Sequence, residues 1–298
     1  QIINPQLFYT AGFSLREILE MRIFTLFITS ILFCASLLHS QPIDTLYKKG
    51  DDALIKGDYE AALSYFKIII GKEPKESTAY NSIGFIHLMQ KNYETSIENF
   101  TKAIELDTNY GRAYSNRGAA YLFMNDVENA YKDLNQALKI NPNDIMSLNS
   151  LGTLYGQLGK IEESLEMYSK AEDIDPSKVD TYWNRGALLL NLDRFEEALV
   201  EADKAIQVNP SIAKSYYFRG TIYKYLLKYD LAMEDYKKAI ELDSSDGEAY
   251  IRRGILYLSI GDYSKAVEDM EYGLKLKPEL RNDASVSKYL KEAKDKLK

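Results

Sequence analysis

One glycine returns every 34 residues along most of this chain. The series runs through Gly50, Gly84, Gly118, Gly152, Gly186, Gly220 and Gly254. A fixed period between about 20 and 50 residues indicates an array of structural repeats, and it constrains the fold more than any local propensity does. With each glycine counted as position 8, the array divides without an insertion into seven units of 34 residues: 43–76, 77–110, 111–144, 145–178, 179–212, 213–246 and 247–280.

Each unit has the pattern of a helical hairpin. Positions 1–14 carry apolar residues at helical spacing, for example Tyr80 and Ile83 in the second unit. Position 20 is alanine or serine in every unit, so a second helix can approach the first closely. Proline at position 32, as in Pro142 and Pro176, ends that second helix. A hairpin of this size cannot bury its own apolar face, so the units are expected to stack on one another.

The repeated positions resemble those of the tetratricopeptide repeat. In the third unit, Tyr114 stands at position 4, Gly118 at 8, Tyr121 at 11, Ala130 at 20 and Pro142 at 32. The resemblance extends over all seven units, residues 43–280. It implies an all-α fold, a right-handed superhelical solenoid of seven 34-residue helix-turn-helix repeats.

The last eighteen residues, 281–298, read as a C-terminal capping helix. Val286, Tyr289, Leu290, Ala293 and Leu297 form one apolar stripe, and lysines form the opposite face. We expect the stripe to cover the last hairpin and the lysines to face water.

The N-terminal segment resembles a secretory signal peptide. Arg22 precedes an apolar run, residues 23–38, and Ser40 precedes Gln41. We interpret residues 21–40 as the signal peptide and residues 1–20 as an upstream, non-structural segment. Cleavage would give an exported protein, periplasmic or extracellular. The alternative is a retained signal anchor, which would tether the protein to a membrane.

The composition excludes several classes of function. The net charge of −7 lacks the cationic surface that nucleic-acid binding needs. Cys34 and His39 would leave with a signal peptide, and the rest of the chain has no cysteine and a single histidine, His87. Thiol nucleophiles and metal sites built on histidine or cysteine are therefore not expected. We predict no catalytic residue, no cofactor and no metal.

Arginine replaces an apolar residue at position 7 in four units, and an acid accompanies it at position 23. Units without the arginine lack the acid, as in the pair Leu151 and Met167. A charge that is partly buried between two helices needs a partner, and a guanidinium suits a carboxylate. We predict four ion pairs within hairpins, and the alternative is a row of anion-binding arginines. The pairs are Arg117 with Asp133, Arg185 with Glu201, Arg219 with Asp235 and Arg253 with Asp269.

The resemblance implies a concave face formed by positions 2, 5, 6, 9, 12 and 13 of the first helices. Amide residues at these positions suit an extended peptide backbone because amides both donate and accept hydrogen bonds. Aromatic residues and arginine suit the anchors that dominate protein interfaces. The predicted partner-binding residues are Trp183, Asn184, Tyr217, Phe218, Tyr225, Arg252, Asn81, Asn116 and Asn149.

The sequence therefore predicts a non-enzymatic, exported scaffold that binds a peptide or protein segment on its concave face. The alternative hypothesis is a membrane-tethered assembly factor of an envelope complex, in which the apolar N-terminal segment is retained.

Overall fold

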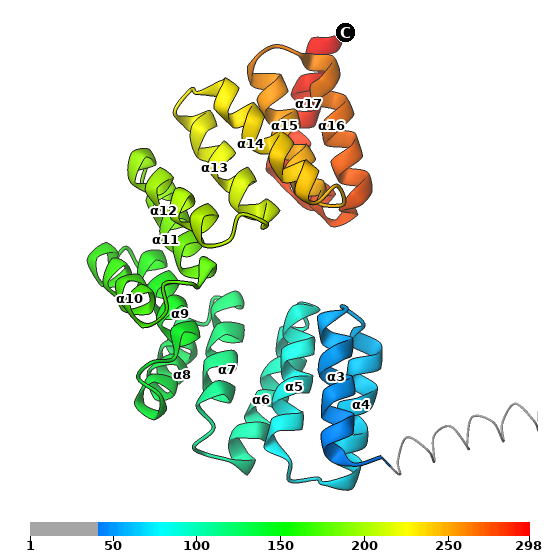
Figure 1. Cartoon of the computed structure of the whole chain (residues 1–298), viewed down its shortest axis with the longest axis vertical. Coiled ribbons are helices and arrows are strands. Elements are labelled where there is room, and N and C mark those ends of the chain that lie inside the picture. Colours follow the sequence, from blue (N-terminus) through cyan, green and yellow to red (C-terminus); the bar gives the residue numbers. More distant parts are fainter. Residues whose placement is uncertain (1–40) are drawn as a thin grey trace, which may run out of the picture. The chain divides into compact units, whose positions relative to one another are not determined.

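A computed structural model describes residues 41–298, and all of its regular secondary structure is helical (Figure 1). The predicted upstream segment, the signal peptide and Cys34 lie outside these residues. Among residues 41–298, none of the helices has both the length and the apolar character needed to span a bilayer. The elements are α3 (Ile43–Ile55), α4 (Tyr59–Lys72), α5 (Ser77–Met89), α6 (Tyr93–Leu106), α7 (Gly111–Phe123), α8 (Val127–Ile140), α9 (Ile145–Gln157), α10 (Ile161–Ile174), α11 (Val179–Asn191), α12 (Phe195–Val208), α13 (Ala213–Tyr225), α14 (Tyr229–Leu242), α15 (Gly247–Ser259), α16 (Tyr263–Leu276), the 3-10 helix η1 (Pro278–Asn282) and α17 (Ala284–Leu297).

The helices form seven consecutive hairpins, numbered one to seven here in chain order. The first helix of every hairpin begins at position 1 and the second at position 17 of the 34-residue unit. A tight turn joins them, and in all seven hairpins the residue at position 15 has a positive φ between 58° and 84°. Glycine takes up this conformation without strain, whereas Leu227 adopts it at a steric cost.

The glycine at position 8 lets the two helices of a hairpin pack closely. A methyl group at this position would lie only 2.7–3.0 Å from a bulky neighbouring side chain. In six hairpins that neighbour comes from position 24 of the second helix of the same hairpin. The six neighbours are Phe66, Phe100, Leu134, Tyr168, Tyr236 and Met270.

Hairpin five has a different neighbour for its glycine. Position 24 is the small Ala202, and the ring of Phe218 from hairpin six fills the space instead. A methyl group on Gly186 would lie 2.9 Å from that ring. Phe218 also packs against the buried Leu189 and Ile222. The sequence thus compensates a small residue in one hairpin with a large one from the next.

The chain divides into two compact units. The first contains hairpins one and two, and its buried core includes Leu46, Phe66 and Ile86. The second, residues 110–298, contains hairpins three to seven and α17. Within each unit, consecutive hairpins pack side by side.

The final helix, α17, packs on hairpin seven as its apolar stripe predicts. Val286 and Ala293 are buried against α15 and α16, and Tyr289 and Leu290 are packed beside them. Leu297 departs from the prediction because its side chain is 52% exposed at the end of the helix. The helix begins at Ala284, after the 3-10 helix η1.

Candidate functional site

The four arginines at position 7 each contact the acid at position 23 of their own hairpin. In each case an arginine nitrogen lies 2.5–2.8 Å from a carboxylate oxygen of that acid. The acids Asp133, Glu201, Asp235 and Asp269 are all buried. These guanidinium groups are therefore structural and do not form a free anion-binding row.

Two of these arginines also join neighbouring hairpins. Arg185 binds Glu172 of hairpin four at 2.6 Å, and Lys204 binds the same carboxylate at 2.9 Å. Arg219 contacts Asp203 of hairpin five at 2.8 Å. Burial works against ionisation of Glu172, but the hydrogen bonds from Lys204 and Arg185 outweigh it and hold the pKa of Glu172 below its ordinary value.

The side chain at position 5 of the repeat was predicted to face a partner. In the compact unit of residues 110–298, it instead contacts the side chain at position 3 of the next hairpin. The amide of Asn149 donates to Thr181 at 3.0 Å, and the indole nitrogen of Trp183 donates to Ser215 at 3.1 Å. Asn149 is buried and Trp183 is half-buried. The expectation that Asn149 is accessible was wrong, because neighbouring hairpins use this position to bind each other.

Tyr217 and Phe218, predicted as accessible anchors, belong to the core between hairpins. Tyr217 is 8% exposed and packs with Ala232 and Ala249, and burial raises the pKa of its hydroxyl. Phe218 fills the space beside Gly186. The structure therefore corrects the prediction that these two rings are accessible to a partner.

Asn81 and Asn116 are also less accessible than predicted. Asn81, in the first unit, is 6% exposed, and Asn116, in the second, is 2% exposed. Close packing of the first helices leaves little room for a ligand at either amide.

Asn184 is the predicted amide that lies in an open site. It lines a cavity of about 410 Å³ between α9 and α11, with Gln157 and Asn191 at the rim. Positions 6, 9 and 13 of neighbouring first helices meet here because residues three, four and seven apart share a helix face. This site is called the amide pocket, and its walls are Thr153, Gly156, Gln157, Ile161, Tyr168, Asn184, Ala187, Leu188, Asn191 and Leu192.

The amide pocket has unused hydrogen-bonding capacity. Gln157 and Asn191 are exposed and Asn184 is half-buried. None of these three side chains forms a hydrogen bond with another residue in the range 41–298. No ionisable acid or base other than the phenol of Tyr168 lines the cavity. The pocket can therefore bind neutral polar groups such as peptide N–H and C=O groups.

Tyr225 and Arg252, the remaining predicted groove residues, line a second cavity of about 240 Å³ near the C-terminus. Residues of α17 complete its wall, including Ser285 and Tyr289. The sequence mapping assigned Tyr225 and Arg252 to the concave face, but it did not predict that α17 contributes to the same cavity, because it treated α17 only as a cap.

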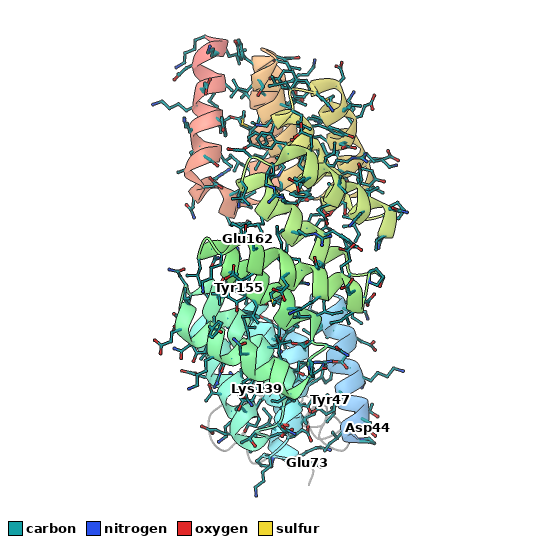
Figure 2. All side chains as sticks on the ribbon, turned by 90° about the vertical axis from the view of Figure 1, so that its left-hand side faces the viewer. Asp44, Tyr47, Glu73, Lys139, Tyr155 and Glu162 are labelled. Atoms are coloured by element: carbon teal, nitrogen blue, oxygen red, sulfur yellow. The ribbon has the colours of Figure 1, made fainter. Side chains whose placement is uncertain are left out.

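Groups with catalytic chemistry do not gather in the part of the chain that the structure describes. There, no cluster of three or more histidine, cysteine or acidic residues could hold a metal ion. Burial, with a contribution from Lys67, lowers the pKa of His87. Glu162, labelled in Figure 2, lies in the first turn of α10. Glu163 lies in the same turn, and the helix dipole stabilises the negative charge of both residues.

Comparisons with known proteins agree with the repeat architecture. Family models described as tetratricopeptide repeat or TPR repeat together span residues 47–268. The ranges that these family models match are 47–111, 111–144, 134–166, 152–193, 179–212, 213–246 and 235–268. No curated protein matches the chain significantly.

Three solved structures share the fold, each with a TM-score of 0.64. A tetratricopeptide repeat protein from Parabacteroides merdae is 22% identical, over 84% of this chain and 98% of its own. The APC/C hetero-tetramer Cut9–Hcn1 is 18% identical, over 87% of this chain and 48% of the other. Yeast Tom70 is 16% identical, over 87% of this chain and 65% of its own. These identities support a common fold only.

Proposed function

The chain belongs to the tetratricopeptide repeat family, and we propose that it is a non-enzymatic scaffold that binds an extended protein segment at the amide pocket. The fold itself supports a protein-interaction scaffold. The amide pocket is the observation on which we base the location of the binding site.

The chemistry of the amide pocket suits a peptide backbone. Gln157, Asn184 and Asn191 each offer two N–H donors and a carbonyl acceptor, and none of these groups is used within the described chain. A peptide in an extended conformation presents N–H and C=O groups that lack partners. Pairing these backbone groups with the three side-chain amides would give affinity with little dependence on the segment's own side chains.

The walls of the same pocket supply the apolar contact that a bound segment needs. Ala187, Leu188 and Leu192 lie beside the amides, and Leu192 is 38% exposed. The side chain of one residue of the segment can rest on these walls while its backbone meets the amides. The expected partner is thus a protein segment with a small apolar residue at this point.

Selection from a displayed library of random 12-residue peptides tests this proposal. We expect peptides that bind the wild-type chain and bind the double variant Asn184→Ala/Asn191→Ala about tenfold more weakly. Loss of two neutral hydrogen bonds, at about 0.5–1.5 kcal/mol each, accounts for that factor. Isothermal titration calorimetry measures the dissociation constants.

Asn135→Ala is the matched control, because Asn135 donates to the Tyr131 carbonyl of its own helix, α8, and does not line the pocket. Its affinity for the selected peptides should equal that of the wild type. Equal affinity of the wild type and the double variant would locate binding elsewhere and defeat the proposal.

We also propose that the protein is exported, on the basis of Arg22 and the apolar run that follows it. A mature chain that starts at Gln41 would keep the two contacts of that residue, which accepts hydrogen bonds from Lys49 at 3.0 Å and Lys72 at 2.5 Å. N-terminal sequencing of protein recovered from its native source should give a start near Gln41. An intact Met21 in the membrane fraction would instead support the tethered alternative.

A further inference from the structure

The second cavity of the C-terminal region contains a lysine without a counterion. Lys224 of α13 lines it together with Arg252 of α15 and Tyr289 of α17. Within residues 41–298, Lys224 is half-buried, forms no ion pair and donates no hydrogen bond. Its charged group lies only over the ring of its neighbour Tyr225, 4.9 Å from the centroid. The arginines at position 7, in contrast, all have acids.

Arg252 adds donors to this cavity but little net charge. One terminal nitrogen binds Glu248, which offsets its charge. The other lies 3.5 Å from the hydroxyl of Thr221, and the buried Nε has no partner. Burial and the charge of Arg252 lower the pKa of Lys224. Lys224 is therefore the cationic group of this cavity that has no ion-pair partner within residues 41–298.

The other acid close to this cavity is already engaged. Asp283 caps α17, and its Oδ1 accepts hydrogen bonds from the backbone and the hydroxyl of Ser285. Those hydrogen bonds are the main reason that the pKa of Asp283 lies below its ordinary value. Asp283 keeps its negative charge, but that charge acts on Arg252, and no ion pair joins Asp283 to Lys224.

Three phenols and an apolar wall complete the cavity, and one of them, Tyr236, already donates to Thr221. The hydroxyls of Tyr225 and Tyr289 form no hydrogen bond with any residue in the range 41–298, so both can donate. Tyr225 is 51% exposed, and its ring stacks on Phe195 with centroids 5.5 Å apart. Ile255 lines the inner wall. The cavity thus combines one free ammonium group with neutral O–H donors.

We propose that this cavity, called the cationic pocket, binds a single carboxylate carried by an acidic side chain of the partner segment. One unpaired ammonium group matches one monoanion, and Lys224 with the hydroxyl of Tyr289 supplies donors for its two oxygens. The proposal rests on the proposed function for the nature of the partner. It adds that the segment contains an acidic residue, which the neutral amide pocket would not select.

A small probe tests the cationic pocket without any partner. N-acetyl-aspartic acid N-methylamide carries one carboxylate, and its asparagine counterpart is the neutral isostere. We expect the acid to cause a saturable shift of the Tyr289 ring signals in NMR spectra of the tyrosine-labelled full chain, and the amide to cause none. Lys224→Met should abolish saturation, and Tyr289→Phe identifies the signals.

Lys228→Met is the matched control. Lys228 is exposed at the start of α14, so this substitution removes the same charge at a place outside the pocket. Its titration should match the wild type. Equal shifts from the acid and its amide, or equal losses in the two lysine variants, would overturn the proposal.

Selected 12-residue peptides provide the second arm. Replacing one acidic residue of the peptide by its amide should weaken wild-type binding about tenfold, as expected for a lost charge-assisted hydrogen bond. The same replacement should have no effect on binding to Lys224→Met. Peptides without such an acidic position would contradict the proposal. A library that yields no peptide counts against the proposed function, while the probe titration still decides the cationic pocket.

Discussion

Phe218→Ala is expected to destabilise the second unit by about 3 kcal/mol. Replacing a packed phenylalanine by alanine costs about 3–5 kcal/mol in protein cores, and the lower figure applies because Phe218 is half-buried. The ring fills the space between Gly186, Leu189 and Ile222, and Ala202 is too small to replace it. Thermal or urea unfolding followed by circular dichroism measures the loss.

The second substitution Ala202→Phe provides the decisive control. It places a ring at position 24 of hairpin five, as in hairpins one and two, and should recover a large part of the lost stability in the Phe218→Ala background. In the wild-type background the same change overfills the core and should be destabilising. A further control is Phe123→Ala, whose ring is 65% exposed, with an expected change below about 0.5 kcal/mol. Additive effects of the two substitutions would show that the rings do not share one space.

Arg185→Leu is expected to cost about 3 kcal/mol. The side chains of Arg185 and Glu201 are each 9% exposed, and a guanidinium nitrogen lies 2.5 Å from a carboxylate oxygen. Removal of the arginine leaves the carboxylate buried without this partner. Glu172 loses a contact at the same time. Chemical unfolding of the variant measures this free energy.

The double variant Arg185→Leu/Glu201→Met should cost about 1 kcal/mol or less. Hairpin four already holds this apolar pair, Leu151 and Met167, at the same two positions. The ion pair of Glu172 with Lys204 remains and satisfies the remaining charges. Replacing a whole buried pair by apolar residues is often close to neutral. If the double variant loses the sum of the two single losses, the pair is not coupled and this interpretation fails.

Much of the architecture could be predicted from the sequence, because every hairpin obeys the same geometry. The spacing of 34 residues and the small residues where helices approach are local requirements, and each is visible in the sequence. The ion pairs between positions 7 and 23 could be predicted for the same reason. Arginine and acid change together between hairpins, as Arg253 with Asp269 shows against Leu151 with Met167.

The accessible site was harder to predict, because it depends on how one hairpin adjusts to the next. Assigning each residue to a generic concave position put Phe218 in the groove, since its compensation of Ala202 involves two different hairpins. Asn149 was misplaced because its partner, Thr181, lies 32 residues away in the next hairpin. A comparison of position 24 with position 6 of the following repeat would have revealed that Phe218 compensates for Ala202. No comparable sequence pattern marks the contact of Asn149 with Thr181.

The cationic pocket lies where the repeat pattern ends, and this explains why the sequence mapping missed part of it. Lys224 and Arg252 occupy ordinary first-helix positions, but Tyr289 belongs to α17, which follows no 34-residue rule. The apolar stripe of α17 predicted that the helix covers hairpin seven. It could not predict that a phenol on that helix would line the same cavity as a lysine on α13.

The amide pocket is the central claim, and photo-crosslinking of a selected peptide tests it most directly. A benzophenone amino acid replaces Leu192, which lies at the pocket and is 38% exposed, or Val200, which is 54% exposed on α12 and does not line the pocket. We predict that irradiation joins the peptide to the chain labelled at position 192 and not to the chain labelled at position 200. Crosslinking at position 200 in equal or greater yield, with the peptide still bound, would contradict the proposed site.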